Sequence, residues 1–560
     1  MPHSPWDSYY PRPRLRRESF LPLNDGWTLD GRPIRAPWPP QAPLSEFDGA
    51  VGARLSYALT FTLPQGFLRE GQRAVLHFGA VDQVAEVTLN GRKVMEHAGG
   101  YLPFAADVTG ALNTAGENRL ELLAIDTLSR RYPYGKQHRR PHGMWYTPVS
   151  GLWQPVWLEA VPEKGAVRGL RATPDLTGVT LEVRTDSPRF AVTVPLEGGG
   201  ELRAEGVPGL PLRLDLPDPH LWTPDDPFLY DFTVTTQTET VSSYFALRTV
   251  TTREIDGYTR LCLNDKPVFL HGVLDQGYFH DGLFLPAEPA EYERDILRMK
   301  ALGFNLLRKH IKVEPEAFYC ACDRLGMLVM QDMVNSGGYS YVFDTVLPTL
   351  RMKKRFDRLP GDRRRREFFE QHCLDTIRRL YSHPCIIGWT IFNEGWGQYD
   401  SDRVCRLCKR SDPTRFFVAT SGWFAQKEGD VQSEHVYFTP RVLRAKKPGK
   451  LLLLSECGGY TRRVPGHGSE GKKDYGYGAA DSEGALTGRI RDLYGTMVLP
   501  SIPNGLCGCV YTQLSDVEGE INGLYTYDRQ VCKVDQAAML SLAEDLREAH
   551  RRACGGVANA

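Results

Sequence analysis

Two glutamates that follow long apolar runs are the strongest candidates for chemistry in this sequence. Glu394 comes directly after the run 386–392 and Asn393, and Glu456 comes after four leucines and Ser455. A glutamate at the end of a buried strand faces apolar neighbours, which raise the pKa of its carboxyl group by desolvation. Two such carboxyl groups facing one cavity can break an acetal, because one protonates the leaving oxygen while the other attacks the anomeric carbon.

The two glutamate motifs carry different weight. Asn-Glu occurs once in the sequence and Ser-Glu five times, so only the leucine run distinguishes Glu456. Either glutamate alone could instead cap a following helix. Together they favour catalysis, and their separation decides its stereochemistry. Carboxyl groups about 5 to 5.5 Å apart imply retention at the anomeric carbon, and roughly 6.5 to 9.5 Å implies inversion.

The elements that must position the two glutamates form a repeating pattern after Cys262, where apolar strands alternate with amphipathic helices. Eight strands are expected, at 268–273, 304–307, 327–330, 386–392, 415–420, 435–438, 451–454 and 507–514. This count predicts a (β/α)8 TIM barrel over residues 254–553, with reactive groups at the carboxyl ends of its strands. The glutamates then end the fourth and seventh strands. The helix between the fifth and sixth strands is poorly marked.

The chain before the barrel has a different pattern, made of short alternating runs that are separated by Gly, Asn, Asp and Pro. This pattern predicts an all-β sandwich over residues 15–162 and a second one, of immunoglobulin-like size, over 163–253. Asn90-Gly91 is the strongest hairpin signal, because both residues can adopt a positive φ.

The composition excludes several classes of protein. Lys and Arg number 68 among 560 residues, as do Asp and Glu, so no net charge attracts nucleic acid or an anionic membrane. No apolar stretch reaches the about 18 residues of a membrane span, and the first residues lack a leader, which predicts a cytoplasmic protein. The first cysteine is Cys262, and the twelve cysteines indicate reduced thiols. Assembly into a homo-oligomer is left open.

A series of motifs runs through the whole chain in order. The first unit contains Leu-Asn-Asp-Gly-Trp at 23–27, Gly-Gly-Tyr-Leu-Pro-Phe at 99–104 and Gly-Leu-Trp-Gln-Pro-Val-Trp-Leu at 151–158; the second contains Leu-Trp-Thr-Pro at 221–224; the third contains Trp-Thr-Ile-Phe-Asn-Glu at 389–394 and Leu-Ser-Glu at 454–456. They resemble glycoside hydrolase family 2. The resemblance implies a jelly-roll domain, an immunoglobulin-like domain and a catalytic TIM barrel, in that order.

The resemblance also implies roles for individual residues. Glu394 corresponds to the acid/base of the family, Glu456 to the nucleophile, and Asn393 to the donor to the sugar 2-hydroxyl. Arg308 matches the arginine that keeps the nucleophile ionised, although a salt bridge at the barrel rim would also explain it. Tyr437 occupies the position of the tyrosine that hydrogen-bonds the nucleophile, although a tyrosine on a strand is often a core residue.

Other positions are candidates for sugar contacts. Asp275 ends the first barrel strand, Trp396 flanks the acid/base, and Tyr511 ends the eighth strand where the family carries an aromatic sugar platform. His310 follows Arg308 by two residues, whereas the family histidine follows by three, so its role stays open.

The type of sugar is predicted from a position at which the sequence departs from one branch of the family. The glucuronidase branch pairs the substrate carboxylate with an Asn-x-Lys motif, but the comparable segment 521–525 has Leu524 at the lysine position. A leucine cannot pair with a uronate, so a retaining exo-glycosidase of a neutral sugar such as a β-galactoside is expected. An α-L-arabinofuranosidase, a β-D-galactofuranosidase and a β-glucuronidase remain alternatives.

The expected partner is an oligosaccharide or glycoside substrate, and no cofactor is expected. No residues are assigned as metal ligands, and whether a metal ion assists stays open. The pair Cys405 and Cys408 indicates buried thiols rather than a zinc site, because no second Cys or His pair accompanies it. A non-catalytic carbohydrate-binding protein is the alternative of another class, and it is disfavoured because a pure binder does not need two strand-end carboxylates.

Overall fold

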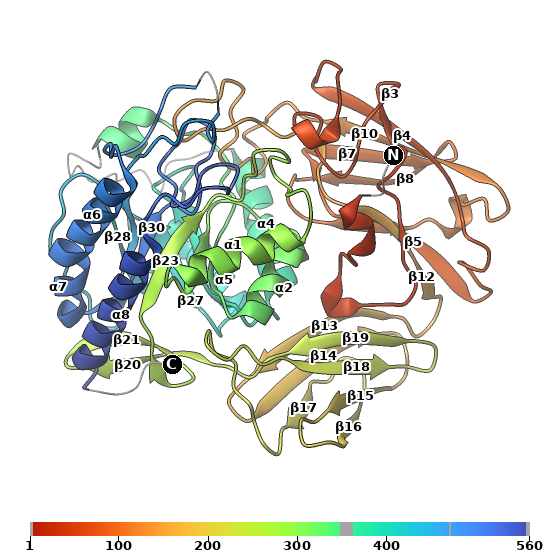
Figure 1. Ribbon diagram of the computed structural model, residues 1–560. Helices are drawn as coiled ribbons and strands as arrows, with labels where there is room; N and C mark the ends of the chain where they lie inside the picture. The colour runs from red at the N-terminus through yellow and green to blue at the C-terminus, as the bar shows by residue number, and fades with distance from the viewer. Residues whose placement is uncertain (1–3, 348–361, 470–471, 556–560) are drawn as a thin grey trace.

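The computed structural model describes residues 4–347, 362–469 and 472–555, which form three units (Figure 1). Two β-sandwiches come first along the chain, and a barrel of strands and helices follows them. Each sandwich has its own buried apolar cluster. The predicted fold class is thereby confirmed.

The first unit packs two antiparallel sheets against each other. One sheet contains β1 (Leu21–Pro22), β12 (Val156–Pro162), β5 (Gln72–Phe78) and β9 (Phe104–Asp107); the other contains β3 (Arg32–Pro33), β2 (Thr28–Leu29), β4 (Arg54–Thr62), β10 (Glu117–Ile125), β7 (Val84–Leu89) and β8 (Arg92–Ala98). Asn90 and Gly91 join β7 to β8 with φ of 50° and 77°, as the hairpin signal predicts.

The second unit is a smaller antiparallel sandwich. Its sheets contain β13 (Val167–Pro174), β14 (Gly178–Thr185) and β17 (Leu212–Asp215), and β16 (Glu201–Gly206), β15 (Phe190–Pro195), β18 (Tyr230–Thr235) and β19 (Thr240–Phe245). Buried and exposed residues alternate along β18, so one face of its sheet forms the core. A three-stranded sheet of β20 (Val250–Ile255), β21 (Tyr258–Leu263) and β22 (Lys266–Pro267) leads into the barrel.

The third unit is an eight-stranded parallel barrel. Its strands are β23 (Leu270–Asp275), β24 (Leu306–Lys309), β25 (Leu328–Asp332), β26 (Ile386–Asn393), β27 (Phe416–Ser421), β28 (Val431–Val436), β29 (Leu451–Gly458) and β30 (Leu506–Thr512). Its helices include α1 (Ala290–Ala301), α2 (Glu316–Leu325), α4 (Arg363–Leu380), α5 (Ser401–Ser411), α6 (Glu483–Leu493) and α8 (Gln536–Ala553). Among the described residues, β27 and β28 share no ladder, and residues 422–430 between them form no helix.

The sixth strand differs from its predicted position, because it begins at Val431 and ends at Val436 instead of covering 435–438. Phe438, the last residue of the predicted strand, is 69% exposed. Tyr437 therefore stands just beyond the strand, at the mouth of the barrel.

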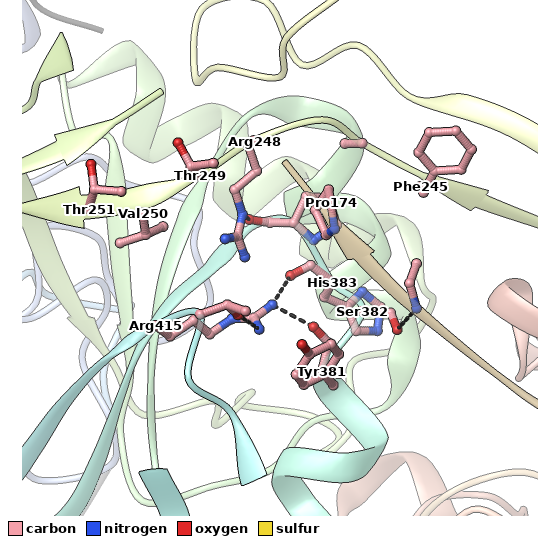
Figure 2. A pocket seen from close by; sticks show the side chains of 14 residues that line it. Pro174, Phe245, Arg248, Thr249, Val250, Thr251, Tyr381, Ser382, His383 and Arg415 are labelled. Atoms are coloured by element: carbon pink, nitrogen blue, oxygen red, sulfur yellow. Dashed lines mark hydrogen bonds between the residues drawn. The ribbon is translucent and has the colours of Figure 1, made fainter. Parts of the chain in front are cut away.

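An arginine of the second sandwich binds the amino-terminal end of β26, and an arginine of the barrel braces the segment before that strand. Arg248 donates to the backbone oxygens of Pro384 and Ile386 at 3.0 and 2.9 Å. Figure 2 shows Arg415, which reaches the carbonyl oxygens of Tyr381 and His383 at 2.6 and 2.9 Å. The second sandwich thus attaches at the end of the barrel opposite to the strand ends that carry the glutamates.

The first sandwich attaches at the mouth. Its connection between β10 and β11 (Gly151–Leu152), here called the 126–150 segment, lies on the barrel loops. Tyr134 donates from its amide to Asn335 O at 3.1 Å and from its hydroxyl to Gly337 O at 2.9 Å, and the Thr147 amide donates to Glu518 Oε1 at 2.8 Å. Side chains of the first unit can therefore reach the barrel mouth.

None of the described helices is both long enough and apolar enough to cross a membrane.

Candidate active site

Glu394 and Glu456 meet in one cavity at the carboxyl ends of β26 and β29. They are 8% and 5% exposed, and one carboxylate oxygen of each lies within 4.8 Å of the other. Glu394 is the residue directly after β26, where the backbone turns with φ 51° and its amide donates to Ser421 O at 3.1 Å. A positive φ at a non-glycine residue is strained and is found where a site holds a side chain in place.

Both oxygens of Glu456 accept hydrogen bonds from the protein. Arg308 Nη1 lies 2.9 Å from Oε1, and the hydroxyl of Tyr437 donates to Oε2. Burial alone would raise the pKa of Glu456, but the positive charges of His435 and Arg308 and the Tyr437 hydroxyl outweigh it and hold the pKa well below its usual range. Glu456 is therefore a carboxylate at any ordinary pH.

Arg308 holds the site together from β24. Its side chain is fully buried and contacts groups on four other strands: Asp332, Asn393, Ser421 and the Ser455–Glu456 pair. Such a planar fork of donors can satisfy several acceptors at fixed angles. Here the ion pair is part of the site and not a bridge at the rim.

His310 has a place in this network through Asp332. Its Nδ1 lies 2.7 Å from Asp332 Oδ2, and Arg308 Nε lies 3.0 Å from Oδ1 of the same carboxylate. His310 therefore orients the partner of Arg308. Burial lowers its pKa to about 4, and the charge of Lys136 acts in the same direction.

Asn393 is fixed with its amide oxygen inward. Oδ1 accepts from Arg308 Nη2 at 2.9 Å and from Ser421 Oγ at 2.6 Å. These two donors orient the amide so that its NH₂ group is directed away from them.

His435 joins the two glutamates. Its Nδ1 is 2.8 Å from Glu394 Oε1 and 3.5 Å from Glu456 Oε2, and its side chain has no exposed surface. Burial and the charge of Glu456 raise the pKa of Glu394, and His435 and Lys136 reduce this rise only in part. Glu394 thus tends to keep its proton while Glu456 is ionised.

The sequence interpretation gave His435 no role. The available signal was its position two residues before Tyr437, since residues i and i+2 of a strand share a face. Lys136 was also missed. It lies on the 126–150 segment, is 7% exposed, and its Nζ sits 5.7 Å from the ring of Trp396 and 5.8 Å from that of Tyr146.

Trp396 stands beside the site but is covered by protein. It is 1% exposed and stacks on Trp145 of the 126–150 segment, with ring centroids 5.4 Å apart at 25°. Its indole NH has no hydrogen-bond acceptor within the described part of the chain. Trp396 thus forms a wall behind Glu394.

The other two candidates, Asp275 and Tyr511, make contacts within the protein. The oxygens of Asp275 accept from Lys309 Nζ at 2.5 Å and from the Gly277 amide at 2.8 Å, so a buried ion pair occupies this carboxylate. Tyr511 is fully buried against Gly458. Its neighbour Thr512, on the other face of β30, reaches the hydroxyl of Tyr437 at 3.1 Å.

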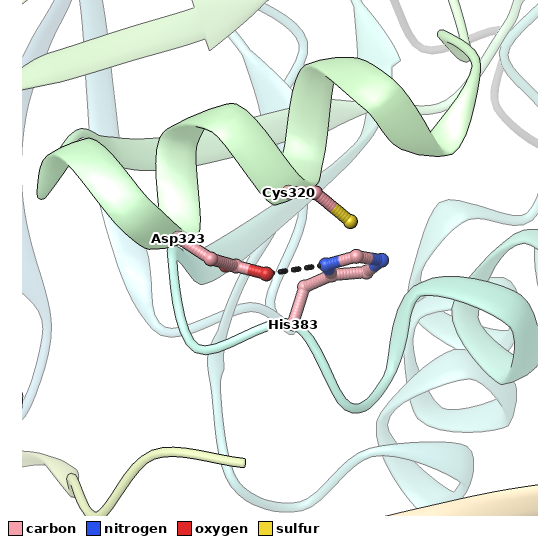
Figure 3. Close-up of side chains that lie close together, drawn as sticks. All are labelled: Cys320, Asp323 and His383. Carbon is pink, nitrogen blue, oxygen red and sulfur yellow. Dashed lines mark hydrogen bonds and ion pairs between the residues drawn. The ribbon is translucent and has the colours of Figure 1, made fainter. Parts of the chain in front are cut away.

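Two groups among the described side chains have the composition of metal ligands. Glu394, His435 and Glu456 form the first, but Arg308 and Tyr437 already satisfy Glu456. The second group is Cys320, Asp323 and His383 (Figure 3). Asp323 accepts there from His383 Nδ1, the Cys385 amide and the Tyr244 hydroxyl at 2.6, 2.9 and 2.7 Å, which makes it a buried structural joint between α2, the approach to β26 and the second sandwich.

A barrel that presents two adjoining carboxylates on its fourth and seventh strands has the architecture of the barrel glycoside hydrolases. Comparison with known families gives the same class. The sugar-binding domain of glycosyl hydrolases family 2 matches residues 43–145, a further domain of the family matches 172–248, and its TIM barrel domain matches 254–440. The chain belongs to glycosyl hydrolases family 2.

Among curated relatives, the chain is 24% identical over 379 residues to a β-galactosidase of Thermoanaerobacter pseudethanolicus, a match that covers 62% of this chain and 46% of the relative. It is 26% identical to a β-galactosidase of Pectobacterium atrosepticum over 73% of this chain and 41% of the relative. The chain thus spans less than half the length of these relatives.

Solved structures share the fold along nearly the whole chain. A β-D-glucuronidase of Dictyoglomus thermophilum superposes with a TM-score of 0.75 at 18% identity, covering 96% of this chain and 98% of that one. A β-glucuronidase of an uncultured Clostridium species gives 0.71 at 19% identity, covering 97% and 100%.

Proposed function

We propose that the chain is a retaining exo-glycosidase in which Glu456 is the nucleophile and Glu394 the acid/base. The observation that carries the proposal is the approach of the two carboxylates to within 4.8 Å. This separation leaves no room for a water molecule between carboxylate and anomeric carbon, and it agrees with the about 5 to 5.5 Å of retaining enzymes.

The electrostatics divide the two roles. Glu456 is held ionised by Arg308, so its oxygen attacks the anomeric carbon and forms a glycosyl ester. As the bond to the leaving oxygen breaks, Glu394 transfers its proton to that oxygen. Glu394 then takes a proton from water, whose oxygen attacks the anomeric carbon and releases Glu456. The final sugar has the original configuration, and both carboxyl groups return to their starting states.

The proposed substrate is a neutral sugar, with a β-galactoside first. The curated relatives are named β-galactosidases. Leu524, at the position of the uronate-binding lysine, is fully buried, and the nearby Lys533 pairs with Asp516 at 2.7 Å, so neither offers a cation to a carboxylate. The furanosides and the β-glucuronide remain alternative substrates, and the experiment below includes them.

The test uses nitrophenyl glycosides of β-galactose, β-glucuronate, β-mannose, α-arabinofuranose and β-galactofuranose. We expect Glu456→Gln to abolish turnover. We expect Glu394→Ala to lose roughly 10² to 10⁴-fold on poor leaving groups and to recover in part with azide, because the acid supplies about that factor. The control is Glu434→Gln, since Glu434 also follows a serine but pairs with Arg441 at 3.1 Å outside the site.

Full activity of either glutamate variant would contradict the assignment. If the wild-type chain binds a sugar of the panel but cleaves none, the chain is a carbohydrate-binding protein instead.

A further inference from the structure

The 126–150 segment forms one wall of a cleft of about 660 Å³ beside the proposed catalytic centre. Tyr339 and Tyr341 of the barrel line it from the other side. The cleft is therefore built jointly by the first sandwich and the barrel, and neither unit alone would form it.

The charged residues that line this cleft are all basic. They are Arg130, Arg139 and Arg140, and they are accompanied by His138 and His142. The three arginines are exposed, and none of them forms an ion pair with an acidic side chain in the described part of the chain. Arg139 is partly anchored, because it donates to Thr127 O at 2.6 Å. A concave surface of one sign of charge raises the local concentration of ions of the opposite sign.

The cleft begins one aromatic layer away from Glu394. Trp145 and Tyr339 line the cleft, and both rings pack against Trp396, at centroid distances of 5.4 and 5.1 Å. Trp396 follows Glu394 by two residues. Lys136, on the same segment, is near enough to Glu394 for its charge to lower the pKa of that carboxyl against the effect of burial.

The position of the cleft relative to the two glutamates indicates which part of a substrate it would bind. An acid/base residue faces the leaving oxygen, because it must deliver a proton to it, whereas the nucleophile faces the opposite side of the anomeric carbon. The cleft lies on the Glu394 side of the site, beyond Trp396, so a leaving group that extends past Glu394 runs toward it. Its aromatic walls offer stacking surfaces for sugar rings.

We infer that this cleft is a subsite for an acidic leaving group, a sugar that carries a carboxylate or a sulfate. This inference rests on the proposed glycosidase function and deepens it: the sugar that forms the ester with Glu456 is neutral, and the sugar that leaves with the proton of Glu394 is anionic. Arginine is suited to this role because its fork of donors matches the oxygens of carboxylate and sulfate.

The test compares three disaccharides that share the glycon found with the nitrophenyl panel. Their leaving sugars are glucose, glucuronate and glucose 6-sulfate. We expect kcat/KM to favour the two acidic substrates by about tenfold at low salt and the advantage to fall at high salt, because exposed charges are screened. The carboxylate and sulfate arms identify which anion is preferred.

The variant Arg130→Gln/Arg140→Gln should remove the preference without changing turnover of the neutral nitrophenyl glycoside. Arg131→Gln is the matched control, because Arg131 lies next to Arg130 but pairs with Asp362 at 3.3 Å and does not line the cleft. Equal kcat/KM for the three disaccharides, with the nitrophenyl glycoside still cleaved, would overturn the inference and leave the proposed function intact.

A binding measurement decides the inference even if no glycoside is cleaved. Calorimetric titration with a trimer of galacturonate should show binding to the wild-type chain and to Arg131→Gln, and at least about tenfold weaker binding to Arg130→Gln/Arg140→Gln. Absence of binding, or equal binding by all three proteins, would mean that the basic residues only solvate the surface.

Discussion

One imidazole serves both carboxyl groups of the site. His435 Nδ1 contacts Glu394 at 2.8 Å and Glu456 at 3.5 Å, while Arg308 contacts only Glu456. The two glutamates therefore share a contact with the imidazole, and only Glu456 also contacts an arginine. That asymmetry, more than the burial that both share, separates the proposed acid/base from the proposed nucleophile in the same cavity.

His435→Asn should move both limbs of the pH profile of kcat/KM to higher pH. Burial raises the pKa of both carboxyls and His435 lowers it in both, so without the imidazole both pKa values rise. The acidic limb follows the protonation of Glu456 and the alkaline limb follows the deprotonation of Glu394, so both shift upward. We expect about a tenfold loss of kcat/KM, the equivalent of one charged hydrogen bond.

The control for that profile is His467→Asn, because His467 makes a similar 2.7 Å contact with Asp528 away from the site. Unmoved limbs in His435→Asn, or equal shifts in both variants, would show that His435 does not position the glutamates.

For individual residues, the sequence predicts the site side chains that directly follow apolar runs. It does not predict those whose position depends on which face of a strand they occupy or on a segment far away along the chain. Glu394 and Glu456 follow runs whose burial is evident. Tyr511 seemed to face the mouth because it ends a strand, but the face of a residue depends on register, and a shift of one residue reverses it. Lys136 reaches the site from another domain, which spacing along the chain does not reveal.

Among the elements, the end of β27 is shaped by the need to admit His435. Gly422 directly follows the strand with φ 77°, and a Cβ atom there would lie 2.7 Å from His435 Nδ1. No side chain fits between the backbone and the imidazole, so glycine is required for both its conformation and its size.

Gly422→Ala should destabilise the fold and also lower kcat/KM. Gly449→Ala is the matched control, because Gly449 has φ 70° but nothing within 4 Å of a Cβ. Both variants should lose about 1 kcal/mol from the strain of a positive φ. Only Gly422→Ala should lose activity, by displacing His435. Thermal unfolding and kinetics on the nitrophenyl substrate measure the two effects, and equal activity in both variants would contradict this account.

Barrel strands were predictable because parallel strands are covered on both faces and read as continuous apolar runs. β26 and β29 are buried along their whole lengths. β28 was misplaced because its buried residues are interrupted by polar ones, and the weak signal after β27 reflects a connection that contains no helix over residues 422–430.

In the whole molecule, the two sandwiches serve opposite ends of the barrel. The first sandwich extends the 126–150 segment to the mouth, where it supplies Lys136 and Trp145. The second attaches where the strands begin. A net charge of zero concealed this arrangement, because the sum over 560 residues hides a local group of cations at the mouth.

Arg248→Met should weaken the joint of the second sandwich and leave the chemistry unchanged. The substitution leaves the backbone oxygen of Pro384 without this donor in a buried interface, at a cost of about 1 to 3 kcal/mol for an unsatisfied group, whereas the oxygen of Ile386 keeps its bond from Arg415 Nε at 2.7 Å. We expect earlier thermal unfolding and faster hydrogen exchange at the start of β26, with kcat/KM unchanged well below the unfolding temperature, because the glutamates lie at the other end of that strand. Arg253→Met is the control, since Arg253 is exposed on β20. Equal stability of the two variants would mean that the arginine does not hold the domains together, and a loss of activity at low temperature would mean that the joint and the site are coupled through β26.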